Sequence, residues 1–314
     1  DRSVTGKIAR QQCQGEIQLP LSDCGVVALD YRGRAGIATS IGHAPQAALV
    51  DPAAGSVLSI AEALTNIVWA PLSEGLDSVS LSANWMWPCK NEGEDARLYR
   101  AVEACSDFAC SLRINIPTGK DSLSMTQKYG KDKVYSPGTV IISAGAEVSD
   151  IRKVVSPVLR TGVNSTIYYI DFSFDKLKLG GSAFAQSLDK IGKEVPTVQD
   201  SEYFANAFNA VQELINKELI LAGHDISAGG MITTMLEMNF ANTEGGLEVS
   251  LDEIPEKDLV KILFSEIPGI LIQVEKPDEV EKILKKAGVA FIRLARPCDE
   301  RHLLIHKDGA DYQF

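Results

Sequence analysis

The sequence predicts an α/β protein made of two parts with different element orders. Over residues 1–150, apolar runs typical of strands are joined by short turns and interrupted by two helical patterns. Over residues 165–314, strand and helix patterns alternate. We therefore expect an α+β N-terminal domain with a mostly antiparallel sheet and helices on one side, a linker over 151–164, and a layered α/β C-terminal domain with a mixed sheet.

The N-terminal elements follow from periodicity. Residues 1–20 are polar and irregular, and Arg32-Gly33-Arg34 is a candidate hairpin turn. Alternating or β-branched runs predict strands over 24–31, 35–41, 78–85, 113–117 and 139–148. Apolar residues at helical spacing predict helices over 53–70 and 94–112. We expect loops over 118–122 and, because of its charge, over 128–133.

The boundary lies where periodicity fades. Residues 151–164 carry little pattern and include Pro157 and Gly162. Beyond them, strands are expected over 165–171, 247–251, 269–274, 289–294 and 302–306, and residues 219–222 lead into the segment that begins at His224. Helices are expected over 182–191, 202–217, 231–241, 256–264 and 278–287, and Asp200 or Ser201 is the expected cap of the second.

Composition excludes two classes of partner. A net charge of −11 over 314 residues argues against nonspecific nucleic-acid binding, which needs a basic surface. No apolar run reaches the roughly 18 residues of a membrane span. The six cysteines form no C-x-x-C pair and no zinc spacing, so we expect reduced thiols in a cytoplasmic protein. The chain starts at Asp1 without an initiator Met, and we expect a piece of a longer protein.

Glu62 and Asn66 stand four residues apart in the helical pattern over 53–70 and therefore project from one helix face. A carboxylate beside an amide oxygen, on a helix otherwise built for burial, suits Mg²⁺. The alternative is a polar pair on the solvent side of an amphipathic helix, which is the commoner situation. The helix alone leaves both interpretations open.

The segment His224 to Gly230 is a second candidate. Gly229 and Gly230 allow a ligand to approach the backbone closely, and the helix start after them offers unpaired N–H donors. Asp225 is placed to hold a metal that bridges phosphates, and Ser227 to donate to an oxygen. Alternatively, either side chain caps the helix. Asp23, just before the first apolar strand, is by itself typical of a turn.

Residues 118–122 contain Gly-Lys-Asp-Ser, but a phosphate-binding P-loop needs a glycine where Ile114 stands. Lys120 remains a candidate phosphate contact, acting as a point charge on a mobile loop. No cysteine stands in a nucleophile elbow, so the sequence does not support thiol catalysis.

Seven segments occur in this order along the chain: Asp1 to Gly6, Leu21 to Cys24, Ala61 to Asn66, Leu81 to Met86, Pro117 to Met125, Leu179 to Ser182 and His224 to Ser227. Together they resemble the formylglycinamide ribonucleotide amidotransferase (phosphoribosylformylglycinamidine synthase) family. The match runs nearly end to end and corresponds to the second half of the synthetase region in the large single-chain form. This region is related to aminoimidazole ribonucleotide synthetase, whose fold it implies.

The resemblance implies a C–N ligase reaction. The family converts formylglycinamide ribonucleotide, ATP and glutamine to formylglycinamidine ribonucleotide, ADP, phosphate and glutamate. The partners it implies are the first synthetase half and a glutaminase domain of the same chain. We therefore expect the chain alone to be catalytically inert, and to self-associate through the apolar surface that would meet the first half. The alternatives are a stand-alone ATP-dependent synthetase of the same fold and a non-catalytic nucleotide-binding scaffold module.

The resemblance also implies site residues. The second half of the family carries an auxiliary structural ADP with Mg²⁺. By resemblance, its metal ligands fall on Asp23, Glu62, Asn66 and Asp225. Ser22, Ser227, Gly229 and Gly230 would lie at the nucleotide. Loops turned toward the active site of the other half carry Asn84, Gly119, Lys120, Asp121 and Ser122. Where the family often has a second acid, this chain has Ala228, which leaves Asp225 as the only carboxylate of its loop.

Overall fold

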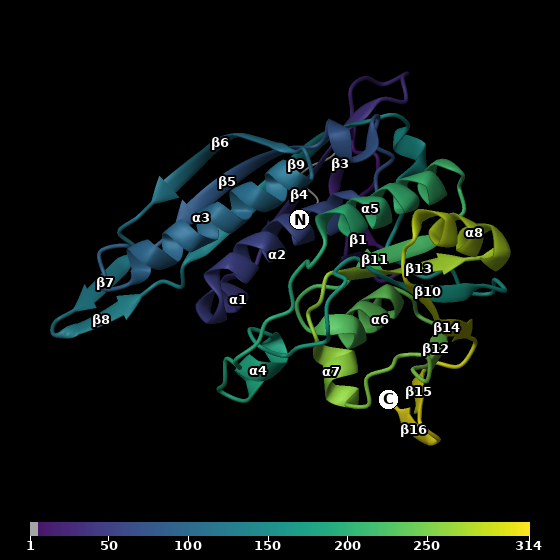
Figure 1. Cartoon of the computed structure of the whole chain (residues 1–314). Coiled ribbons are helices and arrows are strands. Elements are labelled where there is room, and N and C mark those ends of the chain that lie inside the picture. The colour runs from purple at the N-terminus through teal and green to yellow at the C-terminus, as the bar shows by residue number, and fades with distance from the viewer. Residues whose placement is uncertain (1–5) are drawn as a thin grey trace.

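The computed structural model describes residues 6–314, and an open sheet forms the N-terminal half (Figure 1). Neighbouring strands run antiparallel except β5 and β6, which are parallel and joined through a helix. The strand order is β3 (Gly25–Ala28), β4 (Gly36–His43), β9 (Thr139–Val148), β5 (Ser80–Met86) and β6 (Asn115–Ser122). The prediction of a mostly antiparallel sheet is confirmed.

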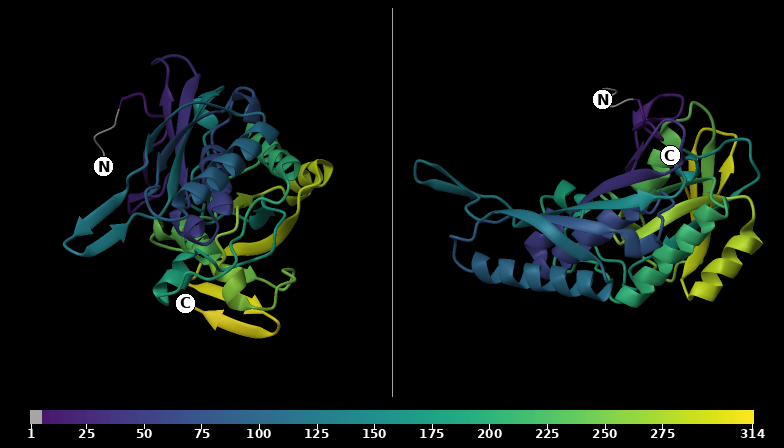
Figure 2. Two further views of the ribbon diagram at one scale, coloured as in Figure 1. Left: turned by 60° about the vertical axis from the view of Figure 1, so that its left-hand side comes forward. Right: turned by 90° about the horizontal axis from the view of Figure 1, so that it is seen from above.

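Helices cover one face of this sheet (Figure 2). Residues of β4 alternate strictly between buried and exposed, so only one face is packed. Helix α2 (Pro52–Ile67) lies against that face, with α1 (Pro45–Val50) before it and α3 (Glu94–Ser111) beside it. The side chain of Asp51 caps α2 by accepting from two backbone N–H groups, and proline follows at the first helical position.

The opposite face of the sheet is uncovered in the described chain. Val27, Ile37 and Ile41 point outward from β3 and β4, and their exposed fractions are 43%, 48% and 57%. A row of exposed β-branched side chains on a sheet face is typical of a surface that meets another protein surface.

Two predicted loops are wrong. Residues Gly119 to Ser122 form the end of β6, because Gly119 lets that strand approach β5: a Cβ there would lie 2.1 Å from the carbonyl oxygen of Ala83. The charged residues after it form an antiparallel arm, β7 (Thr126–Tyr129) and β8 (Asp132–Tyr135), that extends from the sheet (Figure 1).

The lead-in segment, predicted as irregular, contains a small ladder of β1 (Cys13–Gln14) and β2 (Leu19–Pro20). Of the Asp1 to Gly6 motif, residues 1–5 lie outside the described residues.

The C-terminal half contains a longer, mixed sheet, as predicted. Most neighbours are antiparallel, and β12 and β15 are parallel. The strand order is β11 (Ala222–Asp225), β13 (Gly269–Val274), β10 (Thr166–Asp171), β14 (Phe291–Cys298), β12 (Gly246–Ser250), β15 (Leu303–Lys307) and β16 (Ala310–Gln313). The sequence reading did not include β16.

Helices lie on both faces of this sheet, which gives the predicted layers. Along β10, Tyr168 and Ile170 belong to one apolar cluster, whereas Ile167 and Tyr169 belong to another. The first cluster includes α5 (Ser201–Asn216) and α8 (Pro277–Ala287), and the second includes α6 (Gly230–Phe240) and α7 (Leu259–Phe264). The remaining helical segments are α4 (Ala183–Ser187), η1 (Gly75–Ser78) and η2 (Ile151–Lys153). None of the helices over residues 6–314 combines the length and apolar character needed to cross a membrane.

The first apolar cluster is shared by the two halves of the chain. Phe204 of α5 packs edge-on against Phe108 of α3, with ring centroids 5.7 Å apart, and against Phe172, at 5.4 Å. Ile60 and Leu64 of α2 belong to the same cluster. The two sheets are therefore held against one continuous core, and the segments described next meet beside it.

Candidate functional site

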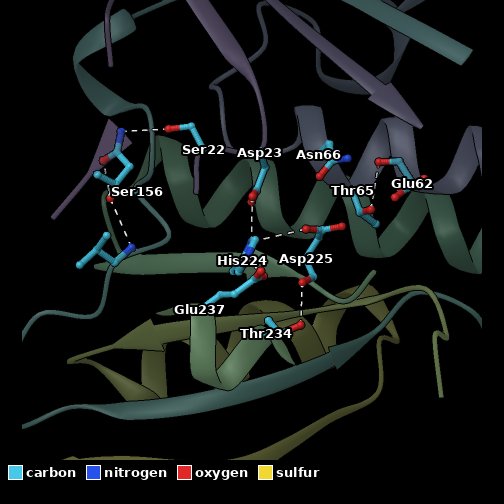
Figure 3. Close-up of polar contacts among 12 residues, drawn as sticks. Ser22, Asp23, Glu62, Thr65, Asn66, Ser156, His224, Asp225, Thr234 and Glu237 are labelled. Carbon is cyan, nitrogen blue, oxygen red and sulfur yellow. Dashed lines mark hydrogen bonds and ion pairs between the residues drawn. The ribbon is translucent and has the colours of Figure 1, made fainter. Parts of the chain in front are cut away.

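Side chains from both halves converge on His224. Its Nδ1 lies 2.8 Å from Asp23 Oδ1 and 3.4 Å from Asp225 Oδ1, and its Nε2 lies 2.9 Å from Glu237 Oε2. Figure 3 shows the imidazole between Asp23, Asp225 and Glu237. One ligand atom from each of Asp23, His224 and Asp225 falls within 4.8 Å of the others. This acid–imidazole cluster brings together two of the predicted metal ligands.

Strands from both halves of the chain position the two aspartates of the cluster. Asp225 ends β11, and the hydroxyl of Thr234 in α6 donates to its carbonyl oxygen at 2.9 Å. Asp23 lies two residues before the start of β3, so it reaches the cluster from the N-terminal sheet. The cluster therefore exists only where the two halves of the chain meet.

The cluster is buried and places like charges close together. The side chains of Asp23 and Asp225 are 4% and 3% exposed. Burial raises the pKa of Asp225 well above its usual value, and the charge of Asp23 raises it further. Burial lowers the pKa of His224, but the charge of Asp23 and the hydrogen bond to Glu237 outweigh it and raise that pKa. The imidazole is the only cation within this acid–imidazole cluster.

One oxygen of each aspartate has no partner. Asp23 Oδ2 and Asp225 Oδ2 are buried and form no hydrogen bond within the described residues. An unpaired buried carboxylate oxygen is costly unless a cation binds it. Oxygen donors of this type suit a hard divalent cation such as Mg²⁺. The donor set therefore fits a cation better than it fits a closed structural network.

Glu62 and Asn66 face this cluster from α2 (Figure 3). The backbone N–H of His43 donates to Glu62 Oε2 at 2.6 Å, and Asn66 Nδ2 donates to the carbonyl oxygen of Ile41 at 3.0 Å. Burial raises the pKa of Glu62. Glu62 stands outside the tight group of Asp23, His224 and Asp225 in the described chain.

A pocket opens beside Glu62. Its walls come from α1 and α2, from Gly180 and Gly181, and from the turn that carries Ser227 and Ala228. Its walls thus combine two glycine-containing turns and apolar side chains with the carboxylates of Glu62 and Glu266, so an anionic part of a ligand would need a bridging cation there. The pocket includes the predicted nucleotide residue Ser227.

The other predicted nucleotide residues are placed differently. Ser22 accepts from Gln14 and donates to the carbonyl oxygen of Gln11, away from the pocket lining. Gly229 and Gly230 have φ values of +90° and +74° and form the start of α6. The N–H of Gly229 already donates to Glu266 Oε1 at 2.8 Å, which also accepts from the N–H of Ala183 at 2.7 Å.

The predicted active-site-facing residues lie at the far edge of the N-terminal sheet from Asp23. Asn84 on β5 pairs in register with Lys120 on β6, next to Gly119. Lys120 Nζ contacts Ser122 Oγ, and the residues from Gly119 to Asp121 are exposed. The structure does not bring them to the acid–imidazole cluster.

Sequence reasoning missed three residues of the site: His224 as a participant, Glu237 and Glu266. His224 was visible beside Asp225 in the recognised segment. Glu237 and Glu266 lie 12 and 41 residues beyond Asp225 and belong to no motif. Glu237 reaches the site through the packing of α6, and Glu266 through the packing of residues 265–268.

The comparisons identify the family. The chain matches the FGAR-AT PurM_N-like domain over residues 1–147 and the AIR synthase related protein C-terminal domain over 164–302. It is 39% identical to a probable phosphoribosylformylglycinamidine synthase of Caenorhabditis elegans, over 98% of this chain and 24% of that protein. The chain belongs to the phosphoribosylformylglycinamidine synthase family. The family resemblance and the fold expected from it are confirmed.

Further family relatives agree. A phosphoribosylformylglycinamidine synthase of Homo sapiens is 39% identical over 94% of this chain and 22% of its own length. The chain thus spans about a quarter of the length of these relatives. Thermotoga maritima PurL, solved as a complex with FGAR, superposes with a TM-score of 0.73 at 17% identity, over 93% of this chain and 46% of that chain. The complex of the same protein with ADP gives 0.69 at 14% identity, over 93% and 45%. At such identity, the superposition establishes the fold alone.

Proposed function

We propose that this chain is the second half of the synthetase region of a phosphoribosylformylglycinamidine synthase. The whole enzyme would convert formylglycinamide ribonucleotide, ATP and glutamine to formylglycinamidine ribonucleotide, ADP, phosphate and glutamate. The observation that carries the proposal is 39% identity to named synthases along 94% to 98% of this chain. Its partners would be the first synthetase half and a glutaminase domain of the same longer chain. The free cysteines suit a reducing cytoplasm.

This half would hold a structural ADP with Mg²⁺. The Mg²⁺ ligands in the proposal are Asp23, Glu62, Asn66 and Asp225, and the unpartnered oxygens of Asp23 and Asp225 support it. When bound, the cation would neutralise the phosphates, which this acidic chain otherwise repels. The pocket beside Glu62 would take the nucleotide, with Ser227 and the start of α6 toward its polar end.

Glu266 sets a condition on this arrangement. Its carboxylate already accepts from the N–H groups of Gly229 and Ala183, which begin α6 and α4. A phosphate would reach the Gly229 N–H only after Glu266 released it. Asn84 and the β6 residues Gly119 to Ser122 would serve the active site of the other half, because they lie away from this pocket.

The experiment is thermal unfolding with and without Mg-ADP. A ligand that binds only the native chain raises the melting temperature, and 100-fold excess over Kd adds about 2.7 kcal/mol of stability. We expect a clear rise with Mg-ADP, little with Mg²⁺ alone, and none in Asp225→Ala or Glu62→Ala. Asp107→Ala, an exposed change on α3, is the control and should keep the rise.

An unchanged rise in both Asp225→Ala and Glu62→Ala would exclude this site. The absorbance and mass of any small molecule released on denaturation would show directly whether the purified chain carries a nucleotide.

A further inference from the structure

The imidazole of His224 contacts acidic side chains at both of its nitrogens: it forms a hydrogen bond at Nε2, and at Nδ1 it forms ion pairs without a hydrogen bond among the described residues. Nε2 lies 2.9 Å from Glu237 Oε2, and Nδ1 lies between the nearer oxygens of Asp23 and Asp225. The His224 side chain is 8% exposed, so the ring itself is largely shielded from solvent. Rotation of the ring would break the hydrogen bond at Nε2 and move Nδ1 away from the two aspartate oxygens.

Helix α6 supplies two contacts that hold His224 and Asp225 in place. Glu237 and Thr234 are three residues apart and therefore share one helix face. Glu237 contacts the His224 ring, while Thr234 donates to the backbone carbonyl of Asp225. One face of α6 thus fixes both the imidazole and the main chain of the neighbouring aspartate.

The two oxygens of each aspartate carboxylate therefore have different surroundings. In each, Oδ1 faces the imidazole and Oδ2 is buried without a partner. A carboxylate held through one oxygen presents the other in a set direction, which is how outer contacts orient metal ligands. Glu237 itself is 35% exposed in its side chain and lies on the far side of the ring from the aspartates.

We propose that Glu237 and His224 are positioning residues for the cation site, acting through Asp23 and Asp225 without touching the ion. This inference rests on the proposed function, because it assumes that the aspartates bind a divalent cation. Glu237 fixes the ring, the ring fixes Oδ1 of each aspartate, and the two Oδ2 atoms are left aimed for coordination. Loss of an outer partner of this kind typically lowers metal affinity 10- to 100-fold.

The test is Mn²⁺ binding in the presence of ADP, followed by electron paramagnetic resonance, in variants of Glu237. Glu237→Leu removes the acceptor for the Nε2 proton and should weaken Mn²⁺ binding by at least about tenfold. Glu237→Gln keeps an acceptor oxygen at the same place and should restore most of the affinity. Glu213→Leu removes an ion-paired carboxylate on another helix and should leave binding unchanged.

The melting temperature in EDTA separates positioning from folding. We expect Glu237→Leu and Glu237→Gln to unfold at similar temperatures without metal. Equal Mn²⁺ affinity in wild type and Glu237→Leu would overturn the inference, as would an equal loss in Glu237→Gln and Glu237→Leu. If the wild-type chain binds no Mn²⁺, the proposed function itself fails.

Discussion

At the residue scale, Gly230 allows the helix start beside the site to pack closely against α7. Its φ is +74°, and a Cβ there would lie 2.6 Å from the carbonyl oxygen of Leu263 and 2.8 Å from backbone atoms of Phe264. The conformation and the contact both exclude a side chain. The start of α6 is therefore packed against the end of α7, and this packing fixes the position of the turn that carries Ser227 into the pocket lining.

We expect Gly230→Ala to lower the free energy of unfolding by about 3 kcal/mol, because it adds backbone strain and overpacking together. Urea unfolding measures it. The matched control is Gly130→Ala, where φ is also positive at +61° but nothing lies within 4 Å of the new Cβ, so only the conformational cost of about 1 kcal/mol remains. Equal losses in the two variants would contradict the packing argument.

The sequence indicated several residues of the site but not all of the residues that contact them. Gly229 and Gly230 were expected to admit a ligand, and the structure gives them a packing role at the helix start. Asp23 and Asp225 were named together only through family resemblance. Their approach depends on how two sheets pack, which spacing along a chain does not encode. Glu237 and Glu266 show no local signal because their partners lie on other elements.

At the element scale, periodicity predicted the elements that bury one face. Helix α3, predicted over 94–112 and found at Glu94–Ser111, carries a clear apolar stripe. The arm of β7 and β8 was missed because almost every residue in both strands is exposed, so no alternation marks them. Helix α1 was missed because it is short and ends just before the Asp51 cap of α2.

Helix α8 is tied to the sheet through Glu281. Its carboxylate accepts from Lys285 one turn away, from Arg293 of β14 and from Tyr168 of β10. These contacts, the one with Lys285 first, lower the pKa of Glu281 to about 2. A lowered carboxylate pKa adds stability above the usual value near 4.5, and that stability is lost as pH falls toward about 2.

Glu281→Gln should therefore cost about 1 kcal/mol at pH 7, a modest value because Lys285 and Arg293 are solvent-exposed. The gap from wild type should close between about pH 4.5 and 2. Denaturant unfolding across that range measures it. A gap that stayed constant with pH would show that packing, rather than charge, is responsible.

Gln212 joins helix α5 to the end of α2. Its Oε1 accepts from the N–H of Leu72 at 2.8 Å, and its Nε2 donates to the carbonyls of Val68 and Ala70 at 2.6 Å and 3.1 Å. The residue is 4% exposed. One side chain from the C-terminal half thus satisfies three backbone groups of the N-terminal half.

We expect Gln212→Leu to lower the free energy of unfolding by about 3 kcal/mol, because it leaves these backbone groups buried and unpaired. Calorimetry or urea unfolding measures it. Asn206→Leu, an exposed change on the same helix, is the control and should stay within about 0.5 kcal/mol. A loss below about 1 kcal/mol in Gln212→Leu would mean that the three groups find other partners.

At the scale of the whole molecule, the uncovered sheet face is the surface through which we expect association. Val27, Ile37 and Ile41 are each more than 40% exposed there. We expect the chain alone to self-associate through this face, seen as an average mass that rises with concentration in sedimentation equilibrium. Ile41→Lys should shift the chain to monomer.

Val134→Lys, which changes an equally exposed apolar residue on the β8 arm, is the control and should leave association unchanged. A wild-type chain that remains monomeric over the whole concentration range would contradict the assignment of this face. So would an Ile41→Lys chain that associates as wild type does.

The continuous core has a consequence for how the protein is made. Ile60, Leu64 and Phe108 leave the ribosome well before Tyr168 and Phe204, yet all five belong to one apolar cluster. The N-terminal sheet and its helices therefore wait with part of their inner surface open until α5 has been synthesised. During that interval a nascent chain has an apolar surface that the finished protein does not, and chaperone capture should peak there and end once α5 docks.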